Sequence, residues 1–401
     1  MKSQIRLRHV LRPREVTGRA HLQVLSVYRD HGVVPKDSRN DNFNKTPADL
    51  SRYQEVRVGD LVVNKMKAWQ GSLAISGLHG IVSPDYQVCS VDQEVNSRFV
   101  HYLLKSSSLI AEYGTRSKGI RPAQWRLYWG DLADISVEIP EESEQRRIAD
   151  FLDAETARID DLLKLTNSQI ETLDERRRSC LGLAMSQDHY PSVRLGYLAS
   201  LVTSGPRGWG DYVGENGVPF FRSANLQRND IEPNLSELAR VDPPIEANAE
   251  ANRSRIRDGD ILIGITGANT GWVAFSSQSL VGANVSQHVC LVRPGAELDS
   301  TWLAYFLTSP AIQESLLGSQ YGGTKTQLSL PDIRGIRVPR APLSEQVAVA
   351  RSLADTLQVL REQGNLRFSW QTLLQERRQA LITAAVTGQF DVTTARGVDV
   401  S

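Results

Sequence analysis

The chain has 401 residues, a length that indicates two or three domains. It is 40% hydrophobic and 23% charged, which is ordinary for a globular protein. The N-terminal residues lack the apolar core of a signal peptide, and no run approaches the roughly 20 apolar residues that cross a bilayer. We therefore expect a cytoplasmic protein without membrane contact.

The cysteines and the charge distribution give further indications of the class of protein and of its partners. Cys89, Cys180 and Cys290 have no CxxC or Cys/His ligand spacing, so neither a disulfide framework nor a zinc site is indicated, and Cys89 and Cys290 are instead expected to be core residues. Residues 1–140 carry 20 basic and 14 acidic side chains, whereas residues 141–188 carry 7 and 12. This pattern suggests nucleic acid for the basic block and a protein partner for the acidic one, although a solvated surface would explain it equally.

One stretch of the chain occurs twice. The segment from Ser143 to Arg177 returns 201 residues later, from Ser344 to Arg378. At this single offset Ser-Glu-Gln at 143–145 matches 344–346, and Glu-Arg-Arg at 175–177 matches 376–378. A repeat at a fixed offset indicates tandem copies of one unit.

Both copies predict long helices. Apolar residues recur in steps of three and four, from Ile148 to Leu181 and from Val347 to Ala384. Ser143 and Ser344 are the expected N-caps, and Gly364 should weaken or bend the second helix. A helix over 143–180 would span about 57 Å, and its narrow stripe needs a partner. We expect the two helices to pair as a coiled coil; packing of each on its own neighbouring domain is the alternative.

The repeat divides the chain into an α+β protein with alternating modules and helices. Arg57-Val-Gly-Asp60 and Arg257-Asp-Gly-Asp260 mark equivalent turns before short strands in the two modules. The expected boundaries are 1–140 for the first module, 141–188 for the first helix, 189–340 for the second module, 341–390 for the second helix, and 391–401 for a loose tail.

The first module has a basic loop between Arg116 and Arg126, after expected strands at 22–28 and 61–65, another from Gly71, and a helix at 99–109. The loop interleaves cations with Gln124 and Trp125, a mixture that suits phosphates and base edges. A solvated loop with a buried tryptophan is the alternative. The candidate DNA-binding residues here are Lys65, Lys67, Trp69, Arg116, Lys118, Arg121 and Gln124.

The second module keeps the framework but changes the loops. Its polar segments are 205–227, 266–270, 284–288 and 322–327. Arg and Lys suit guanine or phosphate, and Asn and Gln suit adenine. The candidate DNA-binding residues are Arg207, Arg222, Asn225, Asn269, Gln287, Lys325 and Gln327.

Catalytic motifs are incomplete. Asp242-Pro-Pro-Ile245 is similar to the Asp-Pro-Pro-Tyr of adenine methyltransferases, but Ile245 replaces the aromatic residue that stacks on a flipped base. The segment 318–326 nearly matches a phosphate loop, but Thr324 separates Gly323 from Lys325. We therefore expect a non-catalytic binding protein without metal or cofactor.

The arrangement resembles the specificity subunit of type I restriction-modification systems. Two modules alternate with two similar helices, each opening with Pro…Ser-Glu-Gln, at Pro140–Gln145 and Pro342–Gln346, and closing with Glu-Arg-Arg. The resemblance implies two target recognition domains that each read half of an interrupted site in double-stranded DNA. It also implies antiparallel helices that act as a ruler and as a dock for two methylase subunits.

The same resemblance assigns S-adenosylmethionine, ATP and Mg²⁺ to the methylase and translocase or endonuclease partners. Three alternatives remain: a DNA-modifying enzyme in its own right, a coiled-coil scaffold with two peptide-binding modules, and a specificity subunit of a modification-only system.

Overall fold

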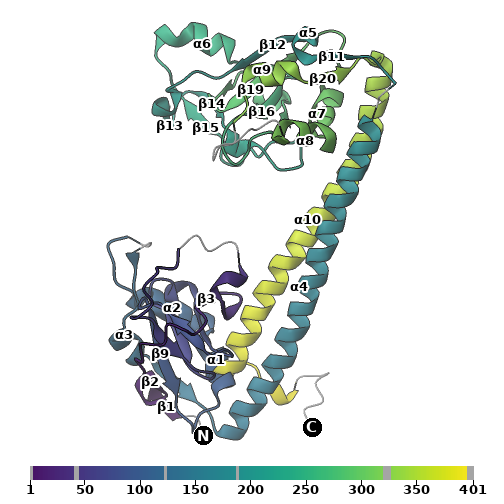
Figure 1. The fold of residues 1–401 in the computed structure, drawn as a ribbon. Helices are drawn as coiled ribbons and strands as arrows, with labels where there is room; N and C mark the ends of the chain where they lie inside the picture. Colours follow the sequence, from purple (N-terminus) through teal and green to yellow (C-terminus); the bar gives the residue numbers. More distant parts are fainter. Residues whose placement is uncertain (1–2, 40–44, 122–123, 187–188, 319–326, 395–401) are drawn as a thin grey trace. The chain divides into compact units, whose positions relative to one another are not determined.

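The computed structural model describes residues 3–39, 45–121, 124–186, 189–318 and 327–394 (Figure 1). The chain divides into two compact units: unit 1 is residues 1–167 with 368–401, and unit 2 is residues 168–367. The helices α4 (Glu142–Met185) and α10 (Leu343–Thr387) each cross the boundary. Each unit therefore contains a β-rich module and one part of both helices.

Unit 1 is built around an antiparallel four-stranded sheet with the order β2-β9-β6-β7, formed by Leu11–Pro13, Tyr86–Val91, Leu61–Asn64 and Leu73–Ile75. Three antiparallel pairs accompany it: β1 (Ser3–Arg6) with β10 (Ser136–Ile139), β3 (Leu25–Tyr28) with β4 (Gly32–Pro35), and β5 (Gln54–Val56) with β8 (Gly80–Val82). The helical elements besides α4 are η1 (Leu7–His9), η2 (Lys36–Ser38), η3 (Ala68–Gln70), α1 (Ser97–Leu104), α2 (Ser107–Arg116), α3 (Trp129–Ala133) and η9 (Val392–Thr394).

Unit 2 has an antiparallel four-stranded sheet with the same connectivity, β12-β19-β16-β17, formed by Ala199–Ser204, Val289–Pro294, Ile261–Gly264 and Val273–Phe275. A second sheet, β13-β15-β14-β18, joins Val213–Gly214, Ala239–Val241, Val218–Phe221 and Asn284–Val285, and β11 (Ser192–Arg194) pairs with β20 (Arg337–Pro339). The helical elements besides α10 are α5 (Leu195–Leu198), η5 (Trp209–Tyr212), η6 (Ser223–Asn225), η7 (Ile245–Ala247), α6 (Asn248–Arg253), η8 (Gln278–Leu280), α7 (Ser300–Thr308), α8 (Pro310–Gly318) and α9 (Leu330–Gly335).

The repeated Gly-Asp turn has the same geometry in both units. Gly59 and Gly259 have φ of +90° and +77°, a left-handed conformation that favours glycine. The following carboxylate accepts the turn's backbone N–H, at 2.8 Å for Arg57 N to Asp60 and 2.7 Å for Arg257 N to Asp260. In each unit this turn leads the chain into an inner strand of the four-stranded sheet, β6 in unit 1 and β16 in unit 2.

The predicted core positions of two cysteines are confirmed, since Cys89 and Cys290 are fully buried and burial raises the pKa of each thiol to about 12. Their strand registers differ, however. Cys89 lies opposite Leu61, whereas Cys290 lies opposite Ile263, two residues further along the neighbouring strand. The repeat is therefore shifted locally in the last strand.

A buried glutamine in the first turn of each long helix, rather than a serine cap, fixes the start of the helix. Both helices start one residue before Ser143 and Ser344, so the predicted N-caps are wrong. Gln145 Oε1 accepts the Asn96 N–H at 2.8 Å and its Nε2 donates to Pro140 O at 2.8 Å. Gln346 makes the matching bonds with Asp299 N at 2.9 Å and Ala341 O at 2.9 Å. The repeated glutamine thus joins each helix start to its module.

The apolar stripes are buried at their ends and at separate positions between them, since Ile159, Leu173 and Leu374 are also buried. Ile148, Leu152 and Ile382 enter the core of unit 1, and Leu181, Leu353 and Leu357 enter the core of unit 2. In the middle of the helices, the predicted stripe residues Leu162, Leu366 and Trp370 are exposed, so that part of the expectation is wrong.

Several expected boundaries change. The helix expected at 99–109 is two helices, because Ser106 is extended (φ −63°, ψ 146°), and the Tyr113 hydroxyl donates to the freed Leu104 carbonyl at 3.0 Å. The helix α10 is continuous through Gly364. The tail expected from 391 is packed at its start, because Val392 lies against the core of unit 1 and Phe390 against Phe151. Among the described helices, none has an apolar stretch long enough to cross a membrane.

We predict that Gln145→Ala and Gln346→Ala each destabilise their own unit by about 1–3 kcal/mol, because each leaves buried backbone groups unpaired. Urea unfolding of the full chain measures this free energy. Ser143→Ala and Ser344→Ala are the matched controls, since these serines lie on exposed turns of the same helices. Equal losses in the serine and glutamine variants would contradict the role of the glutamines.

We also predict that unit 1 loses stability in mild acid through His101. Burial, helped by the charges of Lys105 and Arg378, lowers the pKa of His101 from 6.5 to about 4, and its Nδ1 accepts the Ile75 N–H at 3.3 Å. Because the folded pKa is the lower one, this stability is complete above pH 6.5 and is lost as the pH falls towards 4, by up to about 3 kcal/mol.

His101→Asn keeps an acceptor for Ile75 N–H without titrating in this range. Urea unfolding of the full chain at pH 7 and pH 5 should therefore show a smaller acid effect in the variant. An unchanged difference between the two pH values would exclude His101 as the source.

Candidate nucleic-acid interface

Three segments of unit 2 meet where the strand β16 ends. The Ile265 N–H donates to His288 O at 3.0 Å, and the Leu328 N–H donates to Ile265 O at 2.9 Å. A β-bridge joins Thr266 to Gln327. The turn after β16, the approach to β19 and the segment that precedes α9 therefore form one edge, which we call the reading edge of unit 2.

Polar side chains on this edge are linked to one another. Thr266 Oγ1 lies 2.6 Å from His288 Nδ1, and Gln287 Nε2 lies 3.1 Å from His288 Nε2. Gln287, His288 and Gln327 are exposed. The edge thus offers side-chain donors and acceptors to solvent, the chemistry that base edges in a groove require.

The other end of the same turn is fixed by backbone contacts. Asn269 Nδ2 donates to Ser223 O at 2.7 Å, beside the exposed Arg222. The chain turns so closely that a Cβ at Gly264 would lie 2.1 Å from Asn269 O. Asn225 is buried, accepts the Arg222 N–H at 2.9 Å and donates to Asn234 O at 3.0 Å. Its amide maintains the loop, which disfavours the predicted contact of this side chain with DNA.

Unit 1 builds an edge at the equivalent place with different side chains. The Lys65 N–H donates to Asp85 O at 3.1 Å, and the Leu127 N–H donates to Lys65 O at 2.8 Å, as at Ile265 in unit 2. Asp85 and Arg126 occupy the places of His288 and Gln327, and they form an ion pair of 3.3 Å. This reading edge of unit 1 carries an ion pair where that of unit 2 carries His288 and Gln327.

Two tryptophans hold the loops of the unit 1 edge together. Trp69 and Trp125 meet edge to face with ring centroids 5.4 Å apart, and Trp69 Nε1 donates to Met66 O at 3.0 Å. Both rings are half-buried. Trp69 and Trp125 therefore bring the loops that carry them together, although a long stretch of chain separates the two residues.

The predicted DNA-binding residues of unit 1 differ in whether their side chains already form ion pairs or hydrogen bonds within the protein. Lys67, Arg121 and Gln124 are exposed, whereas Lys65 Nζ donates to Pro84 O at 2.9 Å. Arg116 Nε donates to Glu112 at 2.6 Å, and Lys118 Nζ pairs with Asp131 at 2.8 Å. Because these last two cations are already paired, Arg121 and Lys67 offer the more available positive charge.

In unit 2, Gln287 and Gln327 lie on the reading edge, and Arg222 and Asn269 lie at its other end. Arg207 is exposed on the loop that precedes η5. Lys325 lies outside the described residues. Contact of any of these residues with DNA stays a prediction.

Sequence reasoning did not select Thr266, His288 or Arg126. Each stands in a segment recognised as polar or basic, but only hydrogen bonds between distant segments place it on an edge. Arg126 and Gln327 are separated by 201 residues, the offset of the repeat, and this spacing could have identified them as equivalent.

Within the described residues, no group of three or more His, Cys, Asp or Glu side chains could hold a metal ion. The edges therefore consist of hydrogen-bonding groups and single charges, which can bind and orient a ligand.

Comparisons with known proteins show similarity to one family of proteins. Residues 214–363 match the family model "Type I restriction modification DNA specificity domain". The chain is 22% identical over 295 residues to the type I restriction enzyme EcoBI specificity subunit of Escherichia coli, a match that covers 66% of this chain and 60% of that subunit.

The fold also has solved counterparts. A chain from a structure described as "Structural basis underlying complex assembly and conformational transition of the type I R-M system" aligns over 97% of this chain and 98% of its own length, at 18% identity and a TM-score of 0.69. The HsdS subunit of Thermoanaerobacter tengcongensis aligns over 97% of both chains at 18% identity, with a TM-score of 0.46. The repeated motifs, the family model and the curated relative agree in one respect: each is a similarity of this chain to the type I restriction-modification specificity subunits.

Proposed function

We propose that the protein recognises double-stranded DNA as the non-catalytic specificity subunit of a type I restriction-modification complex. Each module would read one half of an interrupted target. The observation that carries this proposal is the pair of reading edges, which share backbone hydrogen bonds at Lys65 and Ile265 but differ in their side chains. A common framework with different polar groups is what two modules for different half-sites require.

The chemistry of the edges suits different bases or phosphates. Arg126, Lys67 and Arg121 in unit 1 provide cations that can pair with guanine or with phosphate. Gln287, Gln327 and His288 in unit 2 provide hydrogen-bond donors and acceptors that can pair with adenine or other base edges. We propose that the two halves of the target therefore differ in sequence.

We propose that α4 and α10 pair as an antiparallel coiled coil that sets the distance between half-sites. The pairing is supported by contacts within each unit: Arg378 lies 3.5 Å from Asp160 in unit 1, and Arg367 Nε donates to Gln169 at 3.1 Å in unit 2. Helices of 44 and 45 residues extend about 66 Å, enough to bridge half-sites about 34 Å apart.

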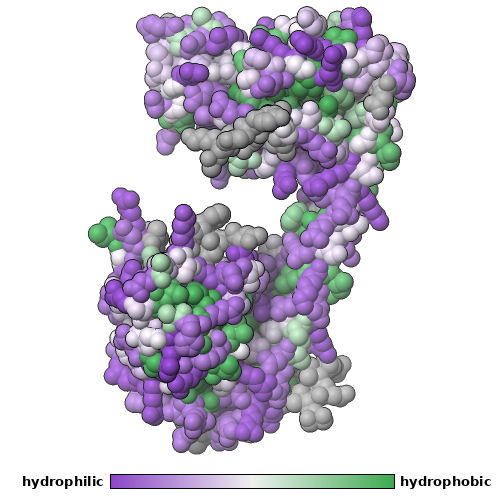
Figure 2. Space-filling view, in the orientation of Figure 1, coloured by the Kyte–Doolittle hydropathy of each residue, from purple (hydrophilic) through white to green (hydrophobic). Residues whose placement is uncertain are grey.

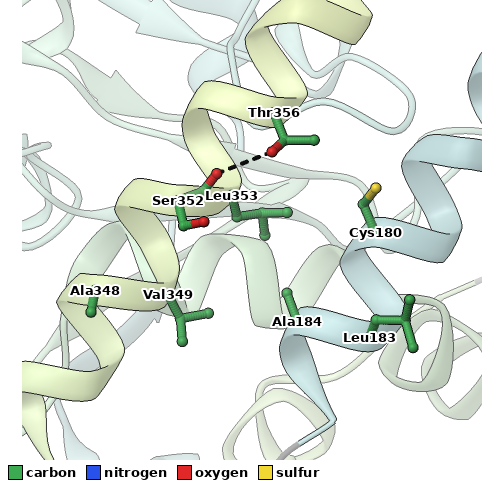
Figure 3. A pocket seen from close by; sticks show the side chains of 8 residues that line it. All are labelled: Cys180, Leu183, Ala184, Ala348, Val349, Ser352, Leu353 and Thr356. Atoms are coloured by element: carbon green, nitrogen blue, oxygen red, sulfur yellow. Dashed lines mark hydrogen bonds between the residues drawn. The ribbon is translucent and has the colours of Figure 1, made fainter.

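We propose that the exposed apolar residues of these helices dock the methylase subunits. Leu165, Phe368 and Trp370 are 61%, 57% and 60% exposed, and apolar side chains interrupt the hydrophilic surface of the helices in Figure 2. A groove of about 560 Å³ adds to this surface in unit 2, lined by Cys180, Leu183, Ala184, Ala348, Val349, Ser352, Leu353 and Thr356 (Figure 3). Long exposed apolar surface is typical of partner sites.

On this proposal, S-adenosylmethionine, ATP and Mg²⁺ belong to the methylase and the translocase or endonuclease subunits. The specificity subunit would contribute sequence recognition and assembly. Its own residues bind DNA and hold the modules at their positions on the helices.

The test is genome-wide mapping of adenine methylation in the host with and without this gene. Loss of one interrupted two-part motif on deletion, and its return on complementation, is the expected result. If methylation is unchanged and no methylase subunit co-purifies with the chain, the proposal fails.

We predict that Arg121→Ala weakens DNA binding by the assembled complex and reduces the slope of log affinity against log salt by about 1, as expected for one lost phosphate contact. A fluorescence-anisotropy titration of target DNA across a salt series measures both quantities. Arg12→Ala is the matched control, because Arg12 is an exposed arginine on β2 that pairs with Asp92. Equal slopes for Arg121→Ala and the wild type would remove Arg121 from the interface.

A further inference from the structure

The loop between Asn225 and Asn234 in unit 2 is closed at its base. The Asn234 N–H donates to Asn225 O at 2.8 Å, and Asn225 Nδ2 returns a bond to Asn234 O at 3.0 Å. Inside the loop, Gln227 Nε2 donates to Glu232 O at 3.0 Å. The loop follows directly on Arg222 and Ser223, which flank one end of the reading edge. A displacement of the loop would therefore be transmitted to that edge.

The tip of this loop contacts both long helices. Asn229 is the sole non-glycine residue in the described part of the chain with a positive φ, +57°, and its Nδ2 donates to Asp174 of α4 at 2.9 Å. Arg361 of α10 donates to Asp230 from a terminal guanidinium nitrogen at 3.0 Å, and its Nε lies 2.9 Å from the same carboxylate. Arg177 of α4 lies 3.6 Å from the same carboxylate. One aspartate thus bridges two helices.

The bridge is shielded from solvent. The side chains of Arg177, Asp230 and Arg361 are 14%, 12% and 24% exposed. Two arginines this close repel each other unless an anion lies between them, and the repulsion is screened less where water is excluded. Glu232 of the same loop adds a second ion pair to Arg361. The helices therefore present two cations, Arg177 and Arg361, which pair with the acidic residues of the loop, Asp230 and Glu232.

Unit 1 has the opposite polarity. At the offset of 201 residues, Arg378 is the equivalent of Arg177, and Asp160 is the equivalent of Arg361. Arg378 and Asp160 form an ion pair of 3.5 Å. The module of unit 1 instead supplies the cation: Arg98 of α1 pairs with Asp150 at 2.7 Å and Asp153 at 2.5 Å on α4. Each module therefore has charges that match its own helix segment.

We propose that Asp230 is the positioning residue of the second module: it fixes the loop and the adjacent reading edge to α4 and α10, and so sets which spacing between half-sites the protein accepts. The reversed polarity of unit 1 means that neither module's ion pairs suit the helix segment of the other. This inference rests on the proposed function for its consequence in DNA recognition, but the clamp itself is a property of the chain.

Two measurements test the positioning role of Asp230. The first is hydrogen exchange of the full chain over residues 225–235, which requires no DNA. Asp230→Asn removes the charge at nearly constant shape and should raise exchange in this loop, whereas Asp230→Glu keeps the charge and should raise it less. Glu297→Ala is the control, because it breaks an exposed ion pair of the same unit, Glu297 with Arg340. If the loop exchanges equally in all four proteins, no clamp exists.

The second measurement is the methylation pattern of the host carrying each variant. The ratio of methylation at targets with the wild-type spacer to targets one base pair longer or shorter should fall about tenfold or more in Asp230→Asn, because removing one partner leaves two shielded arginines uncompensated. The ratio should stay near the wild-type value in Asp230→Glu and Glu297→Ala. An unchanged ratio in Asp230→Asn overturns the positioning role.

The two proposals fail separately. If the wild-type chain directs no bipartite methylation, the proposed function fails, and the exchange data still decide the clamp. If Asp230→Asn does not fold, Arg361→Gln removes the opposite charge from the helix side and is measured in the same two ways.

Discussion

The structure depends on how the narrow apolar stripes of two long helices are buried away from water. A stripe of leucine and isoleucine on a single exposed helix cannot be buried by that helix alone. Here the ends of α4 and α10 enter the cores of the β-rich modules, through Ile148, Leu152 and Ile382 in unit 1 and through Leu181 and Leu353 in unit 2. The modules and helices are therefore parts of the same cores, and the position of a module on its helix segment is set by packing.

The buried glutamines extend this constraint to the backbone. Gln145 and Gln346 are 3% and 1% exposed, and each connects the first turn of a helix to the loop that precedes α1 or α7. A glutamine suits this place because its amide donates and accepts at once, which satisfies two buried backbone groups that a serine at the helix start does not reach.

Beyond this framework, the two units are free to differ. The hydrogen bonds at Lys65 and Ile265 use only backbone atoms, so they fix the path of the chain without restricting the neighbouring side chains. Asp85 and Arg126 in one unit, and His288 and Gln327 in the other, can then stand at equivalent places. The ion pairs between module and helix also differ, with Arg98 on one module and Asp230 on the other. A duplicated protein can in this way keep one fold and acquire two specificities.

The amino-acid sequence by itself determined the repeat, the two long helices, the buried cysteines and the Gly-Asp turns, because these depend on fixed spacing and local periodicity. Tertiary structure decided the rest. Which residues of each stripe are buried and which are exposed, as Leu162, Leu366 and Trp370 are, depends on what packs against the helix. The internal role of Asn225, the edge formed by Thr266, His288 and Gln327, and the bridge from Asp230 to Arg361 depend on contacts between distant segments. Local patterns leave such contacts open, because they form only when sheets and helices pack together.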